Sequence, residues 1–358
     1  MAENFFGNAP NHAMPFDSVT YNGGTVPTTA GYHLVKRGSY GDVTLSTDKC
    51  IIEFDGGCTL DSLRITADQC VVIFGPRLRI GPGDKSNGMI SIAGDRNYVY
   101  LGPNSIITDN GVPNARDSSE DGNGMACVIT GSYNTVEGAN WTSILIGPHS
   151  AGAAYNSSGT AKHNTYKNLR GRNRPNEGSY VSTSDWHASA PHTTFYNCLS
   201  DYASPGSGNT STLGGYKGTT FKLGPIAGTN SASNSAGNGY GSRLIYCYAD
   251  CSGNSPYGSA TSLPTGSSAN NNFGVQNYGA QHAQVIGTYL DSDGQTASLG
   301  MYEPNTLLFG NIWDSPSNMS QETTGTCTAN IFKDPSNSNG TQTNNVAVGG
   351  SIVALTND

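Results

Sequence analysis

The chain has 358 residues, of which 35% are hydrophobic and only 12% are charged, and its formal net charge is −8. Its 18 Lys and Arg residues form no basic field and no apolar run is long enough to cross a membrane, so neither nucleic acid nor a membrane is an expected partner. The N-terminus lacks the basic and apolar regions of a signal peptide, which predicts synthesis in a cytoplasm without a secretory leader.

Residues 1–45 show no repeat and contain several prolines, among them Pro10, Pro15 and Pro27. Two interpretations stay open for them: an extended arm that docks on a partner, and an irregular plug over the first strands. The eight cysteines form no Cys-x-x-Cys pair and have no metal-ligand spacing, so no metal site is expected. Most lie in strand-like segments, where a free cysteine acts as a small core residue, and we expect all eight to be reduced.

From residue 50 onward a short phrase recurs. Residues 195–201 begin with an apolar residue, have Cys at the fourth place and end on Asp, and residues 244–250 repeat all three features. Each phrase is rich in aromatic and β-branched residues, which predicts a strand closed by a turn. The spacing between phrases is unequal, which favours stacked coils whose loops differ in length. This first column of strands is predicted near residues 52, 72, 99, 136, 166, 195, 244, 285, 308 and 328.

A second column lies between these phrases, near residues 87–92, 123–128, 180–182, 221–223, 273–275 and 299–301. At 124–138 the chain reads Gly-apolar-x-apolar, then Gly-Ser-x-Asn, then apolar-x-Gly. This pattern resembles the coil repeat of the right-handed parallel β-helix, or pectin-lyase-like, family, and the resemblance covers residues 46–334. It implies an all-β fold, a single right-handed parallel β-helix of about ten coils. One narrow core is then expected to contain Val72, Val99, Val136, Phe195, Val285 and Leu308.

The resemblance divides the chain into an N-terminal arm or cap at 1–45, the β-helix at 46–334 and a C-terminal cap at 335–358. The cap is expected to be a hairpin that turns at Gly349 and Gly350. Runs of Gly, Ser, Asn and Thr at 202–219, 224–242 and 251–272 are predicted to be long surface loops that pack on one flank or are held by a neighbouring subunit.

An aspartate closes each of the later phrases, and stacking would place Asp201, Asp250, Asp291 and Asp314 above one another. Two carboxylates one or two coils apart have the spacing that a glycosidase needs, so Asp201 and Asp250 are the catalytic candidates if the protein is an enzyme. The other interpretation is a column of turn residues that bond their own backbone, and it is favoured. Asn104, Asn110 and the other stacked Asn residues are expected to form side-chain amide ladders.

Residues 180–192 are the second candidate site, a predicted surface loop with an unusual number of Trp, His and Asp residues. An exposed Trp186 beside Asp185 and His187 would offer a sugar a ring platform and hydrogen-bonding groups, and Asp185 could orient the imidazole as a base. Packing of Trp186 under the loop is the open alternative. The glycan-binding residues predicted are Tyr180, Asp185, Trp186, His187 and His192.

No nucleophile elbow, phosphate-binding loop or His-Glu-x-x-His motif occurs in the sequence. The lyases of the resembled family use acidic calcium ligands and an Arg base, and no such set can be placed on this chain. We therefore expect no cofactor, and fold resemblance alone does not supply an activity.

Three classes of function remain. The first is a structural virion component of a tailed phage (a spike, fibre or capsid decoration), homotrimeric, contacting other virion proteins through residues 1–45 and binding host polysaccharide. The second is a phage depolymerase that cuts host polysaccharide, and the third is a bacterial surface adhesin. The missing signal peptide counts against the adhesin, and the missing catalytic set favours the structural role over the enzyme.

Overall fold

The structure is a computed structural model in which every regular element described is a β-strand. It covers most of residues 29–146 and a series of shorter segments on either side. The described residues are 20–21, 26–27, 29–81, 88–108, 126–146, 149–151, 161–172, 184–188, 190–201, 219–224, 239–250, 273–277, 280–291, 297–301, 305–313, 316–321, 326–333, 341–343 and 346–348.

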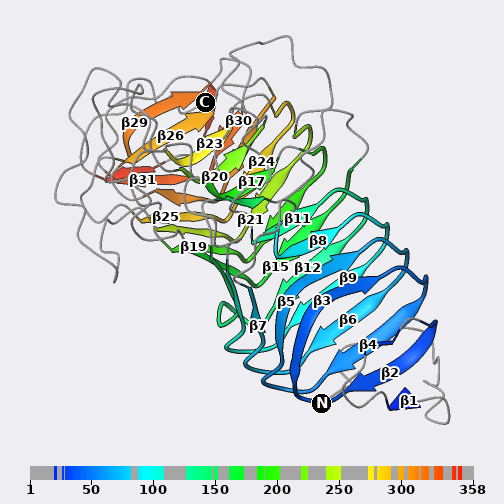
Figure 1. Cartoon of the computed structure of the whole chain (residues 1–358). Coiled ribbons are helices and arrows are strands. Elements are labelled where there is room, and N and C mark those ends of the chain that lie inside the picture. Colours follow the sequence, from blue (N-terminus) through cyan, green and yellow to red (C-terminus); the bar gives the residue numbers. More distant parts are fainter. Residues whose placement is uncertain are drawn as a thin grey trace, which may run out of the picture.

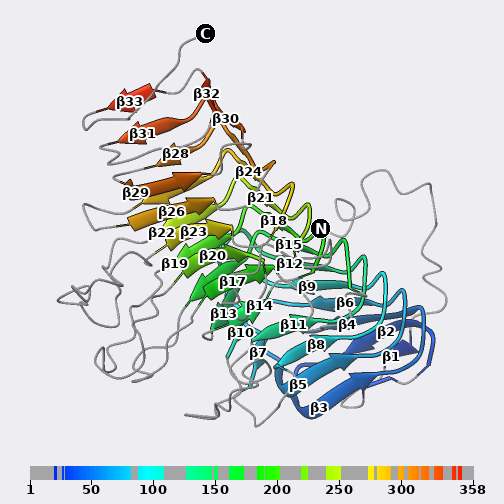
Figure 2. The same cartoon turned by 90° about the horizontal axis from the view of Figure 1, so that it is seen from above.

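Three sheets account for all the described strands, and every strand pair in them is parallel (Figures 1 and 2). Sheet A has 13 strands, sheet B has 14 and sheet C has 6. In spatial order, sheet A contains β1 (Thr20–Tyr21), β2 (Gly31–Val35), β4 (Cys50–Phe54), β6 (Val71–Phe74), β9 (Tyr98–Leu101), β12 (Thr135–Gly138), β15 (Thr165–Lys167), β18 (Thr194–Tyr196), β21 (Arg243–Ile245), β24 (Gln284–Ile286), β27 (Leu307–Phe309), β30 (Thr326–Thr328) and β32 (Thr341–Thr343).

The other two sheets are built in the same way. Sheet B contains β11 (Cys127–Ile129), β8 (Ile90–Ile92), β5 (Thr59–Ile65), β7 (Arg79–Ile80), β10 (Ile106–Ile107), β13 (Ile144–Ile146), β16 (Arg170–Arg172), β19 (Leu199–Asp201), β22 (Tyr248–Asp250), β25 (Tyr289–Asp291), β28 (Ile312–Trp313), β31 (Ile331–Lys333) and β33 (Val346–Val348), with β3 (Ser39–Leu45) paired to β5. Sheet C contains β14 (His149–Ala151), β17 (Ser184–Ala188), β20 (Thr219–Leu223), β23 (Phe273–Asn277), β26 (Ala297–Met301) and β29 (Pro316–Gln321).

From β12 to β29 the chain visits sheets A, B and C in turn and then returns to A. Each strand pairs with the equivalent strand of the preceding and following visit, so that segments tens of residues apart lie side by side (Figure 2). This order is compatible with a parallel β-helix. It rules out two packed antiparallel sheets for the described residues, since antiparallel pairing is absent from them.

Sheet B divides at the seven-residue strand β5. Its first half pairs with β7 through Thr59, and its second half pairs with β8 through Leu63. The line through β7 continues to β33, whereas the line through β8 reaches β11, which contacts β14 of sheet C. Gly81 and Gly88, at φ values of 80° and 84°, stand between β7 and β8, where the chain leaves one line for the other.

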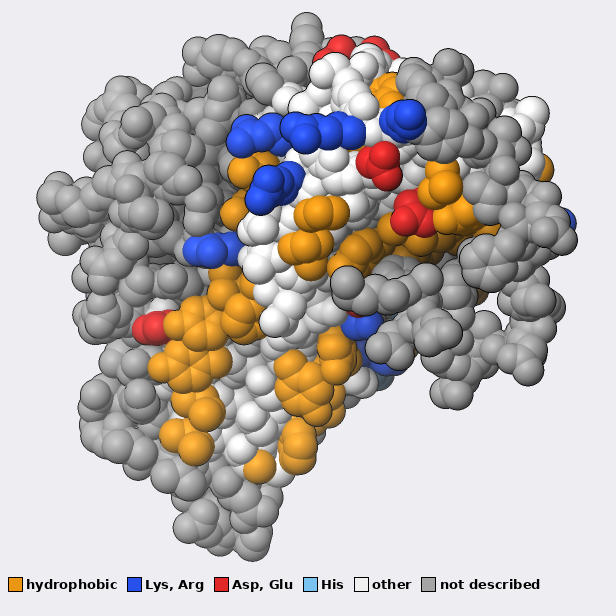
Figure 3. Space-filling view, turned by 90° about the horizontal axis from the view of Figure 1, so that it is seen from below, with side chains coloured by type: hydrophobic (Ala, Val, Ile, Leu, Met, Phe, Trp, Pro, Cys, Tyr) orange, Lys and Arg blue, Asp and Glu red, His pale blue; other side chains and the backbone are white. Residues whose placement is uncertain are grey.

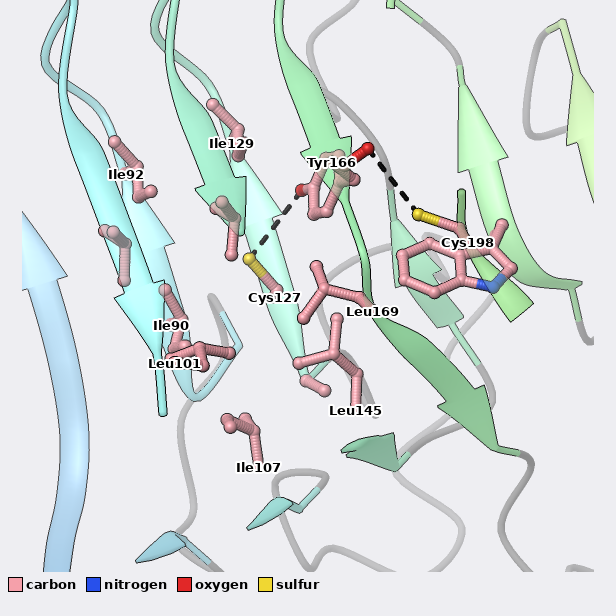
Figure 4. Packing of buried hydrophobic residues seen from close by; sticks show 14 of the residues in the cluster. Ile90, Ile92, Leu101, Ile107, Cys127, Ile129, Leu145, Tyr166, Leu169 and Cys198 are labelled. Carbon is pink, nitrogen blue, oxygen red and sulfur yellow. Dashed lines mark hydrogen bonds between the residues drawn. The ribbon is translucent and has the colours of Figure 1, made fainter. Parts of the chain in front are cut away.

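The predicted first column is confirmed in register. Val72 is paired with Val99, and Val99 with Val136. The column continues through Tyr166, Phe195, Leu244, Val285, Leu308 and Cys327. The six core residues predicted from sequence are all 0% exposed and belong to one hydrophobic cluster that extends from Val35 to Trp313. Figure 4 shows part of this cluster, where the thiol of Cys127 bonds the hydroxyl of Tyr166 and the thiol of Cys198 donates to the main-chain carbonyl of Tyr166.

The recurring phrase is two strands rather than one. Residues 194–196 form β18 in sheet A and residues 199–201 form β19 in sheet B. The third residue of the phrase makes the corner between them, with φ values of 49° at Asn197 and 53° at Tyr246. This left-handed conformation turns the chain sharply, which periodicity along one strand does not predict.

The fourth place of the phrase has a bonding role that explains its repetition. Cys198 donates its thiol to the carbonyl of Tyr166, 3.5 Å away, and Cys247 donates to that of Phe195 at 3.3 Å. Two strands later, Asn311 Nδ2 donates to the carbonyl of Val285 at 2.9 Å. Each side chain thus satisfies a buried carbonyl of the preceding sheet A strand at the corner.

The parallel sheets extend beyond the predicted limits of the β-helix, residues 46 and 334, at both ends. Strand β2 pairs with β4 and β3 pairs with β5, so the parallel sheets begin before residue 46. At the other end, β32 and β33 pair in parallel with β30 and β31, so both strands extend the sheets, and the predicted hairpin turn at Gly349 and Gly350 is not tested. Residues 349–358 lie outside the described part.

The predicted second column corresponds to strands of two different sheets. Residues 90–92 and 127–129 belong to sheet B, whereas 219–223, 273–277 and 297–301 belong to sheet C. The strand expected near 180–182 lies outside the described residues, and the sheet C strand at this step is β17, which pairs with β20. The two sheets share a hydrophobic pattern because both face one core, so sequence alone merged them.

Candidate functional site

A column of stacked rings lies at the turn that leads into sheet A. The residue three places before each first-column core residue has a positive φ, for example 60° at Tyr133, 57° at His163, 57° at His192 and 56° at His282. Its amide donates to the next turn: Tyr133 to the carbonyl of Lys162 at 2.9 Å, and His163 to that of Pro191 at 3.1 Å. One repeated backbone conformation therefore places these side chains above one another.

The rings contact each other along this column. Tyr133 and His163 are stacked at 5.0 Å and 12°, and His163 and His192 at 4.5 Å and 3°. Tyr240 meets His192 edge-on at 5.6 Å and lies 5.1 Å from His282. We call the set the ring column; it comprises Tyr133, His163, His192, Tyr240 and His282.

A glycine makes room for the fourth ring. Gly241 occupies the column position at φ 64°, and a Cβ there would lie 2.6 Å from Nδ1 of His192. The missing side chain lets the preceding residue, Tyr240, present its ring to His192 instead. This is one of the positions where both the φ angle and the close approach require glycine.

A buried amide ladder supports the ring column from below. Asn134 accepts the amide of Asn97 at 2.8 Å, and Asn164 accepts the amide of Asn134 at 2.9 Å, each through Oδ1. Their Nδ2 groups donate to Gly94 and Gly131 at 2.9 and 2.8 Å. Asn134 is the Asn of the Gly-Ser-x-Asn pattern at 131–134, in which the ring residue Tyr133 is the x, and His163 stands in the same way before Asn164. The predicted stacking of Asn side chains is confirmed for these residues, whose buried amides are hydrogen-bonded. Of the two residues named for it, Asn104 is exposed at φ 59° and Asn110 lies outside the described part.

Positive charge surrounds the middle of the ring column. Partial burial lowers the pKa of His192 below 6.5, and the neighbouring His163, Arg243 and Lys162 lower it further. Arg96 lies over the outer face of Tyr133, with Cζ 5.8 Å from the ring centroid. Protonation of His192 is therefore disfavoured, whereas the positive surroundings do not oppose the binding of an anion.

Of the predicted glycan-binding residues, only His192 belongs to the ring column. The expectation of an exposed Trp186 ring is wrong: this side chain is 0% exposed and stacks on Phe221 at 6.2 Å and 10°. It lies on β17, where Trp186 pairs with Phe221, so the second half of the predicted loop is a strand. Asp185 and His187 are on the same strand, and Tyr180 lies outside the described residues.

The aspartate column is brought together by sheet B. Asp201 pairs with Asp250 and Asp250 pairs with Asp291, each as the last residue of its strand. The favoured interpretation as turn residues stays a prediction, because the residues that follow each of these three aspartates lie outside the described part. Asp291 Oδ2 accepts the hydroxyl of Tyr248 at 2.5 Å, and Asp314 lies outside the described residues.

The described thiols are free and have low reactivity. Cys50, Cys58, Cys70, Cys127, Cys198 and Cys247 are buried and form no disulfide. Burial raises the pKa of Cys127 and of Cys247 to about 12 and that of Cys50 to about 11. Because the thiolate is the reactive form, these cysteines serve packing and corner bonds.

Two stripes of apolar side chains flank the corner between sheets A and B. On sheet A the paired residues Tyr196, Ile245, Ile286 and Phe309 form one stripe. On sheet B, the paired residues Leu199, Tyr248, Tyr289, Ile312 and Ile331 form the other. Tyr196, Phe309, Ile312 and Ile331 are 37–46% exposed. Figure 3 shows hydrophobic side chains gathered in two such stripes with polar surface between them.

The sequence pattern did not group the five residues of the ring column. It predicted that His192 lies in a surface loop. A signal exists: every member except Tyr240 lies three residues before a first-column core residue, and each member precedes a small or amide side chain. The described residues include no group of three His, Cys, Asp or Glu side chains that could hold a metal ion. They also include no helix long and apolar enough to span a membrane. No family model and no curated protein matches the chain.

Proposed function

We propose that the three sheets form a single right-handed parallel β-helix that serves as a structural component of a phage virion, a homotrimeric spike, fibre or decoration. The observation that carries the proposal is the pair of apolar stripes along the corner between sheets A and B. Parallel sheets with an inert, continuous core supply the elongated body, and residues 1–45 are the segment proposed to contact other virion proteins.

The stripes favour self-association because exposing apolar side chains to water is unfavourable in free energy. Tyr246 stands at the corner with 56% of its surface exposed, beside Tyr196 in an edge-on contact of 5.9 Å. Contiguous exposed apolar surface of this kind is typical of protein interfaces, where aromatic side chains are the main anchors. A second and third copy of the chain would cover the stripes around one axis, as closed symmetry requires.

The test is the mass of the recombinant chain in solution. Light scattering is expected to give a trimer for the wild type and a monomer for the double variant Tyr246→Ser and Phe309→Ser. Tyr133→Ser is the matched control, because Tyr133 is 47% exposed but lies outside both stripes. A wild type that stays monomeric when concentrated, or a double variant that remains trimeric, would contradict the assembly.

We propose that host glycan contacts the ring column. Tyr133 and His192 supply there the ring surface and hydrogen-bonding nitrogens that were first expected around Trp186. Binding of the wild type to polysaccharide extracted from host cells, reduced in Tyr133→Ala and retained in Tyr246→Ser, would support it. Equal binding by Tyr133→Ala would remove the ring column from consideration.

A depolymerase is the second candidate, and the pairing of Asp201, Asp250 and Asp291 favours it. Neighbouring parallel strands lie about 4.8 Å apart, so carboxylates one or two strands apart approach the spacing of glycosidases. Release of reducing ends from host polysaccharide, lost in Asp250→Asn and kept in the exposed-residue control Asp61→Asn, would establish it. No release by the wild type leaves the structural role.

A further inference from the structure

The ring column contains two imidazoles in direct face-to-face contact. His163 and His192 are parallel within 3°, with their centroids 4.5 Å apart. Neutral rings stack favourably at this distance, since the arrangement buries apolar surface between them. A positive charge on His192 in the same position removes this favourable stacking and is repelled by the cationic groups around it.

The groups that face this pair from neighbouring elements are also cationic. Lys162 precedes His163 in the same turn, and Arg243 begins β21 on the His192 side; both depress the proton affinity of His192. Beyond the pair, Arg96 lies over Tyr133, and His282 is reached through Tyr240. The acid at the Tyr133 end is Asp95, whose Oδ1 accepts the amide of Ser132 at 2.7 Å.

We propose that the ring column is an acid-sensitive contact between turns: His192 stacks on His163 and holds adjacent turns together, and protonation of His192 loosens the turns that lead into β15, β18 and β21. The inference does not depend on the proposed assembly or glycan contact, because it concerns the folded chain alone. Among the described buried residues between Val136 and Leu244 there is no histidine and no carboxylate, the groups that change charge in the same range.

Stability should then depend on pH with a definite sign. The pKa of His192 is lowered in the folded chain, so the unfolded chain binds more protons as the pH falls below 6.5. The stabilising contribution of the neutral stack is complete above 6.5 and is lost as the pH falls through the lowered folded pKa. A raised pKa would have given the opposite dependence.

The variant His163→Gln with His192→Gln removes both charges and keeps a compatible backbone, since Gln69 occupies the equivalent position at φ 57°. His282→Gln is the matched control, because His282 contacts Tyr240 and no second imidazole. Lys162→Gln, at an exposed position of the same turn, is the second variant if the double substitution does not fold.

Thermal unfolding is measured at about pH 7.5 and about pH 5, and each histidine is titrated by NMR. The wild type should lose about 2 °C or more of Tm beyond the loss of the double variant, with His282→Gln resembling the wild type. In Lys162→Gln the pKa of His192 should rise. Equal losses in the wild type and the double variant, or a His192 that titrates above 6.5, would overturn the proposal.

Discussion

Asn164 Oδ1 accepts the main-chain amide of Asn134 at 2.9 Å, and Asn134 repeats the bond to Asn97 at 2.8 Å. The same side chains donate to carbonyls of the preceding turn, so that one amide satisfies two buried backbone groups. The ladder fixes the distance between turns at the one corner where the ring column is displayed. Its loss should therefore affect the backbone of several turns at once.

We expect Asn134→Ala to lower the free energy of unfolding by about 2–4 kcal/mol, because it leaves the amide of Asn97 and the carbonyl of Gly94 buried without partners. Denaturant unfolding followed by circular dichroism measures the change. Asn305→Gly is the control: Asn305 is exposed at φ 60°, which glycine adopts freely. Similar stabilities for the two variants would contradict the role of the ladder.

Val136→Asp should prevent folding, because Val136 is 0% exposed and lies in register between Val99 and Tyr166. An ionised carboxylate there has no partner in the core, and its burial costs more than the chain's whole stability. Thr135→Asp, one residue earlier and partly exposed, should be tolerated. Soluble, folded Val136→Asp protein with native circular dichroism would show that the strand register is incorrect.

Trp186→Ala should destabilise the fold by about 3–5 kcal/mol, since it empties a large volume between Tyr166, Phe195 and Phe221. Thermal unfolding provides the measurement, with Tyr246→Ala as an exposed-aromatic control. Any loss of glycan binding in this variant should follow loss of folded protein. A stable Trp186→Ala chain that specifically fails to bind polysaccharide would contradict the buried position.

The six described cysteines, all buried, should be unreactive until the chain unfolds. With the pKa of Cys127 and Cys247 raised to about 12 by burial, the thiolate fraction at neutral pH is negligible, and it grows only near that pH. A thiol reagent should label native protein slowly and all eight cysteines in denaturant without reductant. Detection of two or fewer thiols in the denatured chain would show that disulfides form.

The amino-acid sequence by itself determined the parallel stacking and the first-column register. Val72, Val99, Val136 and Phe195 could be aligned because a core position admits only apolar side chains of limited volume, which leaves a readable pattern at any spacing. Side-chain ladders of Asn were also expected, but the named residues, Asn104 and Asn110, are not the ones that form it: the ladder is built from Asn97, Asn134 and Asn164.

Only the tertiary structure decided which residues share a surface. Trp186 became a core residue because a strand of sheet C, invisible in the merged hydrophobic pattern, carries it inward against Phe221. His163, His192 and His282 are far apart in sequence and exposed or half-buried, so no packing constraint marks them. What joins them is a positive φ repeated at every turn, and backbone conformation at an exposed position leaves almost no trace in side-chain chemistry.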